Sequence, residues 1–170
     1  MDPYGTYEEI DGRPALRFER RLTHPVERVW RAVTDPGELS HWFPARMDAD
    51  LHPGGHITFT FPDADMPLTE GEVKEFDPPS LFEFTWGDDR LRIELEPAGQ
   101  GCLLRFTHFL AERDQAARDA SGWHVCLAEL DKHLAGEHAT GPGTEMTDEL
   151  RELYAEYEQR GAPTGAPMPS

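Results

Sequence analysis

His108 is the residue best placed to do chemistry, because it is a titratable group that we expect to point into the protein. It lies in the strand-like run 102–109 and shares strand parity with Leu104 and Phe106, so the three side chains should face the same way. A buried imidazole beside a pocket can accept or donate a proton near neutral pH. A core histidine bonded to backbone or water is the more common outcome for such a position. Both interpretations of His108 stay open at this point.

Aromatic side chains dominate the faces that we expect to point inward with His108. The expected inward set comprises Phe59, Phe61, Phe82, Phe84, Trp86, Phe106 and Trp123. Most aromatic residues in such positions simply fill the core. A cavity lined by some of them would suit a flat apolar ligand with one polar group, because unpaired polar atoms are costly there. The candidate ligand-binding residues are Trp42, Phe43, Phe59, Phe82, Phe84, Trp86, His108 and Trp123.

Other residue types that often carry chemistry show no recognisable spacing. The chain has eight histidines, but His52 and His56 flank Pro-Gly-Gly and therefore belong to a turn rather than to a zinc-binding helix. Cys102 and Cys126 form no CxxC motif and are typical of buried thiols. The serines lack the GxSxG context of a nucleophile, and no glycine-rich phosphate loop is present. We therefore expect neither a metal nor a cofactor.

The acidic composition limits the classes of partner. The 170 residues include 16 basic and 33 acidic side chains, and the resulting net charge of −17 disfavours binding to nucleic acid. No apolar run approaches the roughly 18–20 residues of a membrane helix, so no membrane insertion is expected. The N-terminus has neither the basic nor the apolar region of a signal peptide. With only two cysteines, the sequence favours a single-domain cytoplasmic protein.

Seven strand-like runs and two helical regions must position the candidate residues. Residues 25–43 are typical of two short helices, and 112–135 of a long one in which Trp123, Leu127, Leu130 and Leu134 recur at helical spacing. Turn signals separate alternating runs at 15–22, 45–51, 56–61, 69–76, 81–86, 90–96 and 102–109. The apolar face of this antiparallel meander needs a cover. The pattern therefore predicts an α+β fold in which a curved sheet grips the long helix.

The two ends of the chain are expected to lie outside this unit. Residues 1–13 form a polar arm that covers a sheet edge or stays loose, and the domain itself spans 14–136. Residues 137–160 are typical of a linker and an amphipathic appendage helix, which has Met146, Leu150, Leu153 and Tyr157 at helical spacing. The helix at 145–159 can dock on the domain or on a protein partner. Residues 161–170 have the composition of a disordered tail.

Five segments together resemble one known superfamily. They are PVERVWRAVTDPGELSHWF, LHPGGHITFTF, GEVKEFDPPSLFEFTW, CLLRFTHF and GWHVCLAELDKHLAG, and the resemblance covers roughly residues 14–136. Their order is similar to that of the SRPBCC (START-like, helix-grip) superfamily, in the branch related to the activator of the ninety-kilodalton heat-shock chaperone ATPase. The resemblance implies six to seven antiparallel strands wrapped around a long C-terminal helix, with two short helices after the first strand. It also implies a pocket between sheet and helix, with Trp42 and Phe43 near its mouth.

Three functions remain open, because the resemblance implies a fold rather than a reaction. The first is a binding module that holds a small apolar or aromatic ligand between the sheet and the C-terminal helix. The second is an aromatase/cyclase-type enzyme, which needs inward acid–base groups. His108 is the main candidate for that role, with Glu70 or Glu75 as helpers. The third is a chaperone or protein-interaction module, supported by the acidity and by the appendage helix.

Overall fold

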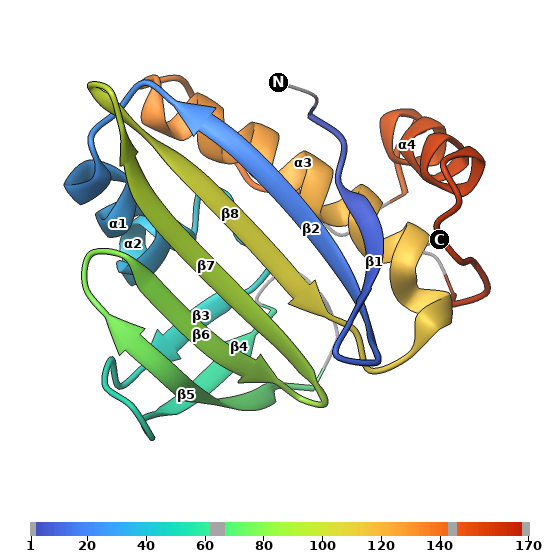
Figure 1. Ribbon diagram of the computed structural model, residues 1–170, viewed down its shortest axis with the longest axis horizontal. Helices are drawn as coiled ribbons and strands as arrows, with labels where there is room; N and C mark the ends of the chain where they lie inside the picture. The colour runs from blue at the N-terminus through green and yellow to red at the C-terminus, as the bar shows by residue number, and fades with distance from the viewer. Residues whose placement is uncertain (1–2, 62–66, 143–145, 168–170) are drawn as a thin grey trace.

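An antiparallel sheet of eight strands forms the centre of the protein in the computed structural model, which describes residues 3–61, 67–142 and 146–167 (Figure 1). The strand order across the sheet is β1-β2-β8-β7-β6-β5-β4-β3. The strands are β1 (Thr6–Ile10), β2 (Arg13–Leu22), β3 (Arg46–Ala49), β4 (His56–Thr60), β5 (Thr69–Asp77), β6 (Leu81–Trp86), β7 (Asp89–Ala98) and β8 (Gly101–Phe109). All seven runs expected from the alternation pattern are strands, with small shifts at their ends.

The eighth strand, β1, is the one that the alternation pattern missed. It pairs with the start of β2 and places Tyr7 opposite Leu16. The turn between the two strands contains Asp11 and Gly12, whose φ angles are 52° and 79°. An Asp-Gly pair with positive φ at both positions is the preferred turn of a two-residue hairpin. The expected count of six to seven strands is therefore corrected to eight, and β1 is a short, charged strand at the sheet edge.

Four helical elements accompany the sheet within the domain. They are α1 (Val26–Thr34), α2 (Pro36–Leu39), the short 3-10 helix η1 (Arg113–Gln115) and α3 (Ala116–Leu134). Asp35 begins α2 by accepting a hydrogen bond from the Glu38 backbone N–H at 3.1 Å, as an N-cap residue should. Figure 1 shows α3 lying along one face of the sheet, with α1 and α2 near one of its ends. No helix in the described parts of the chain is long and apolar enough to cross a membrane.

The core lies between α3 and the inner face of the sheet. Trp123, Leu127, Leu130 and Leu134 are all buried, as their helical spacing predicts. On the sheet, one row of buried side chains crosses five strands in register. This row consists of Leu16, His108, Leu91, Phe84 and Val73. Its composition confirms that His108 faces the interior.

The helix α4 (Asp148–Gln159) packs against α3 beside the β1 edge of the sheet (Figure 1). Tyr157 is buried, and its hydroxyl accepts a hydrogen bond from the Gly5 backbone N–H at 2.9 Å. The same hydroxyl lies 2.9 Å from Nδ1 of His124 in α3. Burial raises the pKa of Tyr157 to about 12, so it is a neutral hydrogen-bonding group at neutral pH. Of the expected docking residues, Leu153 is also buried, whereas Met146 and Leu150 are half-buried.

The segment after α4 differs from the expected disordered tail. Ala162 is buried, and the carbonyl of Pro163 accepts a hydrogen bond from the Ala117 N–H at 3.0 Å. The Ala166 N–H donates to the carbonyl of Asp114 at 3.2 Å. The first N–H groups of a helix lack partners inside the helix, so this segment satisfies one of them at the start of α3. Residues 168–170 of the expected tail lie outside the described residues.

Candidate functional site

Four aromatic rings with nearly parallel planes form the centre of the candidate site. The rings of Phe59 and Trp86 are 4.5 Å apart between centroids and inclined by 11°. Phe43 lies 5.4 Å from Trp86 at 26°, and Phe61 lies 6.1 Å from Trp86 at 25°. We call these four residues the aromatic stack. Their planes are close to parallel, so the stack has the shape that a flat ring system can extend.

Trp123 of α3 completes the stack from the helix side. Its ring lies 5.5 Å from that of Phe43 and 6.5 Å from that of Trp86. It also contacts Phe106 of β8 at 4.6 Å. The indole ring of Trp123 therefore joins α3 to the sheet at the stack.

The stack is closed at one end and accessible at the other. Phe43 and Phe59 are buried, whereas Phe61 and Trp86 are half-buried. The accessible end therefore lies where β4 ends and where β6 turns into β7. The indole Nε1 of Trp86 makes no hydrogen bond with any residue in the described ranges, and this nitrogen is not fully buried.

Phe84 and Phe82 extend the aromatic cluster away from the accessible end. Phe84 lies 6.0 Å from Phe59, and Phe82 lies 4.7 Å from Phe84. Phe82 then contacts Phe76 at 5.7 Å, and both Phe82 and Phe84 are fully buried. These two candidate residues therefore belong to the core that supports the stack.

Trp42 has a different position from the one that the resemblance implied. It is fully buried, and its indole N–H donates to the Ala32 carbonyl at 2.9 Å. Its ring meets the stack through the edge of Phe43, at 5.6 Å and 90°. The hydrogen bond ties α1 to the end of α2. Trp42 therefore anchors the helix pair, and only Phe43 of the two enters the stack.

His108 lies in a hydrogen-bond network at the helix side of the stack. The Trp123 indole N–H donates to Nδ1 of His108 at 2.8 Å, and Nε2 of His108 lies 2.5 Å from Oδ2 of Asp89. Asp89 also accepts hydrogen bonds from the side-chain amide of Gln115 at 3.1 Å and from the Ala111 backbone N–H at 3.0 Å. Both ring nitrogens of His108 are therefore occupied.

The partners of His108 determine its tautomer. An indole N–H can only donate, so Nδ1 of His108 must offer a lone pair to Trp123. The ring proton of the neutral imidazole then lies on Nε2 and is donated to Asp89. Burial alone would raise the pKa of Asp89, but the hydrogen bonds from His108, Gln115 and Ala111 outweigh burial and lower it. Asp89 is therefore an anion at neutral pH.

Sequence reasoning missed Asp89, although its position carried a signal. The run 90–96 was assigned an inner face through Leu91, Ile93 and Leu95. Extending that parity back by one step places Asp89 on the same inner face, where a carboxylate needs partners. The helpers expected for His108 lie elsewhere: Glu75 faces Arg92 at 3.5 Å, and Glu70 faces His56 at 3.7 Å. Neither glutamate contacts His108.

A cluster of titratable groups beside His108 has the spacing of a metal site. Ligand atoms of Asp89, His108 and Asp119 lie within 4.8 Å of one another, the one such group found in the described ranges. However, the Gln115 amide nitrogen lies 3.1 Å from an oxygen of each aspartate, and Arg118 Nε lies 2.8 Å from the other oxygen of Asp119. These N–H groups point at the oxygens that a cation would need. The donor set therefore fits a hydrogen-bond network better than a metal centre.

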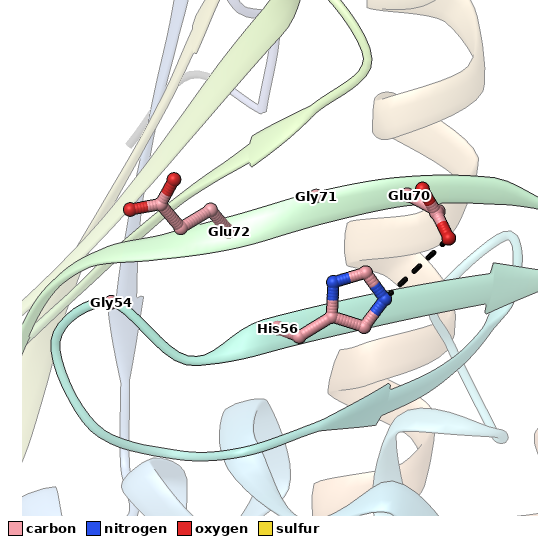
Figure 2. Close-up of a pocket in the computed structure, with 5 residues that line it drawn as sticks. All are labelled: Gly54, His56, Glu70, Gly71 and Glu72. Atoms are coloured by element: carbon pink, nitrogen blue, oxygen red, sulfur yellow. Dashed lines mark ion pairs between the residues drawn. The ribbon is translucent and has the colours of Figure 1, made fainter.

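A surface hollow, separate from the aromatic stack, lies on strands β4 and β5 (Figure 2). Its volume is about 350 Å³, and it is lined by Gly54, His56, Glu70, Gly71 and Glu72. Figure 2 shows the imidazole of His56 turned toward Glu70, while the carboxylate of Glu72 points away from it. All three charged or titratable side chains are exposed. This hollow is a solvated, acidic surface without an aromatic wall.

The fold and the position of the site define a class of protein. A curved antiparallel sheet wraps around a long C-terminal helix, and a helix pair follows an early strand. This arrangement is the helix-grip fold of the SRPBCC superfamily. Residues 23–135 match the family model described as "Activator of Hsp90 ATPase homolog 1-like protein", and the chain belongs to this family. A search of curated proteins found no match.

Solved structures show the same fold at low sequence identity. The solution structure of CalU16 from Micromonospora echinospora is 22% identical, with a TM-score of 0.74, and the match covers 94% of this chain and 91% of that one. The NE0264 protein from Nitrosomonas europaea is 23% identical, with a TM-score of 0.63, over 76% of this chain and 99% of that one. DynU16, a protein in the dynemicin biosynthetic locus, is 24% identical, with a TM-score of 0.64, over 73% of this chain and 48% of DynU16.

Proposed function

We propose that this protein binds a flat, apolar or aromatic small molecule at the accessible end of the aromatic stack, between the sheet and α3. The observation that carries the proposal is the parallel arrangement of Phe43, Phe59, Phe61 and Trp86, with the last two half-buried. Offset stacking of a ligand ring on these faces would add to the free energy of burying its apolar surface. The biosynthetic locus of DynU16 also supports a small-molecule role for this fold.

The polar contacts available at the site favour a ligand with one hydrogen-bond acceptor. Trp86 Nε1 has no partner in the described parts of the chain, so its N–H can donate to a ligand carbonyl or phenolic oxygen. The nitrogens of His108 are occupied and offer a ligand nothing unless its present hydrogen bonds break. A ligand with several polar groups would lose hydrogen bonds to water without replacing them.

The geometry supports binding better than an aromatase/cyclase-type reaction. A general base must reach the proton that it removes, whereas His108 is held between Trp123 and Asp89. The glutamates proposed as its helpers are paired with Arg92 and His56 instead.

The chaperone or protein-interaction alternative has less structural support, because α4 uses Leu153 and Tyr157 to dock on its own domain. The two free, buried cysteines support a cytoplasmic location.

The test uses the four tryptophans as built-in reporters. The full chain is labelled with nitrogen-15, and its indole N–H signals are assigned through single Trp→Phe variants. A panel of polycyclic aromatic ketones and phenols is then titrated in. We expect saturable binding in the micromolar range, with large shifts at Trp86 and Trp123 and small shifts at Trp30 and Trp42.

Matched variants separate site binding from non-specific adsorption. Phe61→Ala removes one ring at the accessible end and should weaken binding several-fold. Leu68→Ala removes an exposed apolar side chain close by in sequence, at 59% exposure, and should leave affinity unchanged. Equal shifts at all four indoles, or no saturable binding by any compound, would refute the proposed function.

A further inference from the structure

We propose that Asp89 is a positioning residue: through His108 it holds the Trp123 indole in place, and it thereby sets the affinity of the ligand site. The inference rests on the proposed function and names a further residue that determines affinity at the same site. It is carried by three groups from three elements that meet in one chain of hydrogen bonds, Asp89 of β7, His108 of β8 and Trp123 of α3.

The first step is the choice of tautomer. An imidazole has one proton to place on two nitrogens, and a carboxylate beside one nitrogen draws the proton there. Asp89 is anionic and faces Nε2, so Nδ1 keeps its lone pair. Nδ1 is then the acceptor for the Trp123 indole N–H at 2.8 Å. Without a carboxylate at position 89, the proton could move to Nδ1, and the two N–H groups would then face each other.

The second step is the coupling to the ligand site. The indole of Trp123 has one N–H, and its orientation is fixed when that N–H is bonded. The same ring lies 5.5 Å from the ring of Phe43, 4.6 Å from that of Phe106 and 6.5 Å from that of Trp86. Two of these residues belong to the aromatic stack. Loss of the bond to His108 would leave a buried indole N–H without an acceptor, so the ring would turn or admit water.

The first experiment needs no ligand. Nitrogen-15 spectra of the full chain report the tautomer of His108 and the hydrogen bond of the Trp123 indole N–H. We expect the Nε2–H tautomer of His108 and a hydrogen-bonded Trp123 indole N–H at neutral pH. An Nδ1–H tautomer, or a Trp123 indole N–H without a hydrogen bond to His108, would overturn the proposal.

The second experiment uses two neighbouring aspartates that differ in contact. Asp89→Asn removes the charge that orders the network, and Asp88→Asn removes the same charge from an exposed side chain next to it. With the best compound of the panel, we expect wild type and Asp88→Asn to bind equally and to give the same Trp123 indole signal. Asp89→Asn should bind about fivefold more weakly, the effect of about one hydrogen bond, and its Trp123 indole signal should be shifted.

The outcomes distinguish this inference from the proposed function. Equal affinities and equal Trp123 indole signals for the two variants would overturn the positioning role of Asp89 while leaving ligand binding intact. If no compound binds the wild-type chain, the proposed function fails, and the spectra alone decide whether Asp89 orders His108 and Trp123. If Asp89→Asn does not fold, the wild-type tautomer of His108 and the hydrogen bond of the Trp123 indole still decide.

Discussion

Leu130→Ala tests whether α3 is gripped by the sheet. Leu130 is 1% exposed and lies in the core cluster with Trp123 and Leu127. Truncating a leucine in such a position costs about 2–5 kcal/mol, from lost burial and from the cavity that remains. For a domain of this length each kcal/mol corresponds to roughly 2–4 °C, so the melting temperature should fall by about 4–20 °C. Urea unfolding followed by circular dichroism should show a lower midpoint with an unchanged slope.

Leu68→Ala is the matched control for this substitution. It deletes the same atoms from a side chain that is 59% exposed, so its cost should stay within about 0.5 kcal/mol. The comparison removes effects that any Leu→Ala change has on the unfolded chain. A cost for Leu130→Ala below about 0.5 kcal/mol, or equal to that of the control, would refute the packing of α3 on the sheet.

Three further predictions each concern one buried or partly buried residue. Tyr157→Phe should lower the free energy of unfolding by about 1–3 kcal/mol in urea titrations, because the Gly5 N–H loses its acceptor. The pKa of Asp89 is lower in the folded protein than in the unfolded chain, so ionised Asp89 contributes to the free energy of unfolding. This contribution is complete above the unfolded pKa of about 3.9 and is lost as pH falls through the folded pKa. Asp89→Asn should therefore lessen the loss of stability below about pH 4, measured by urea titrations at each pH. Burial raises the pKa of the Cys126 thiol, so mass spectrometry should detect its alkylation at neutral pH only after unfolding.

Strand parity accounts for most of what the sequence predicted correctly. A strand alternates its faces with a period of two, so once Phe106 is assigned to the core, His108 must follow it. The same rule brings Phe59, Phe84 and Trp86 to one face across β4 and β6. The period of α3 places Leu130 and its neighbours against that face. Within a regular helix or strand, the direction of one side chain thus determines the direction of the others. This direction decided which candidate residues face the core.

The predictions that differ from the structure concern residues whose orientation is not set by helix or strand periodicity. Trp42 follows α2 in an irregular stretch, and its indole is directed by one hydrogen bond to Ala32 rather than by a helical face. The segment 161–167 is held by backbone bonds to Asp114 and Ala117, which no composition rule reveals. The turn at Asp11 and Gly12 did carry a local signal, because this dipeptide favours a hairpin, and the polar composition around it concealed the strand.

His108 shows why the two interpretations of a buried histidine do not exclude each other. Its nitrogens are fully bonded, as expected of a core histidine, and this removes it as a free acid or base. The same two hydrogen bonds fix the orientation of the imidazole, because the proton on Nε2 and the lone pair on Nδ1 each have one partner. In our proposal, His108 in this state couples the charge of Asp89 to the position of Trp123. Under the proposed function, the chemical role of His108 then lies in what it holds, not in any proton that it transfers to a ligand.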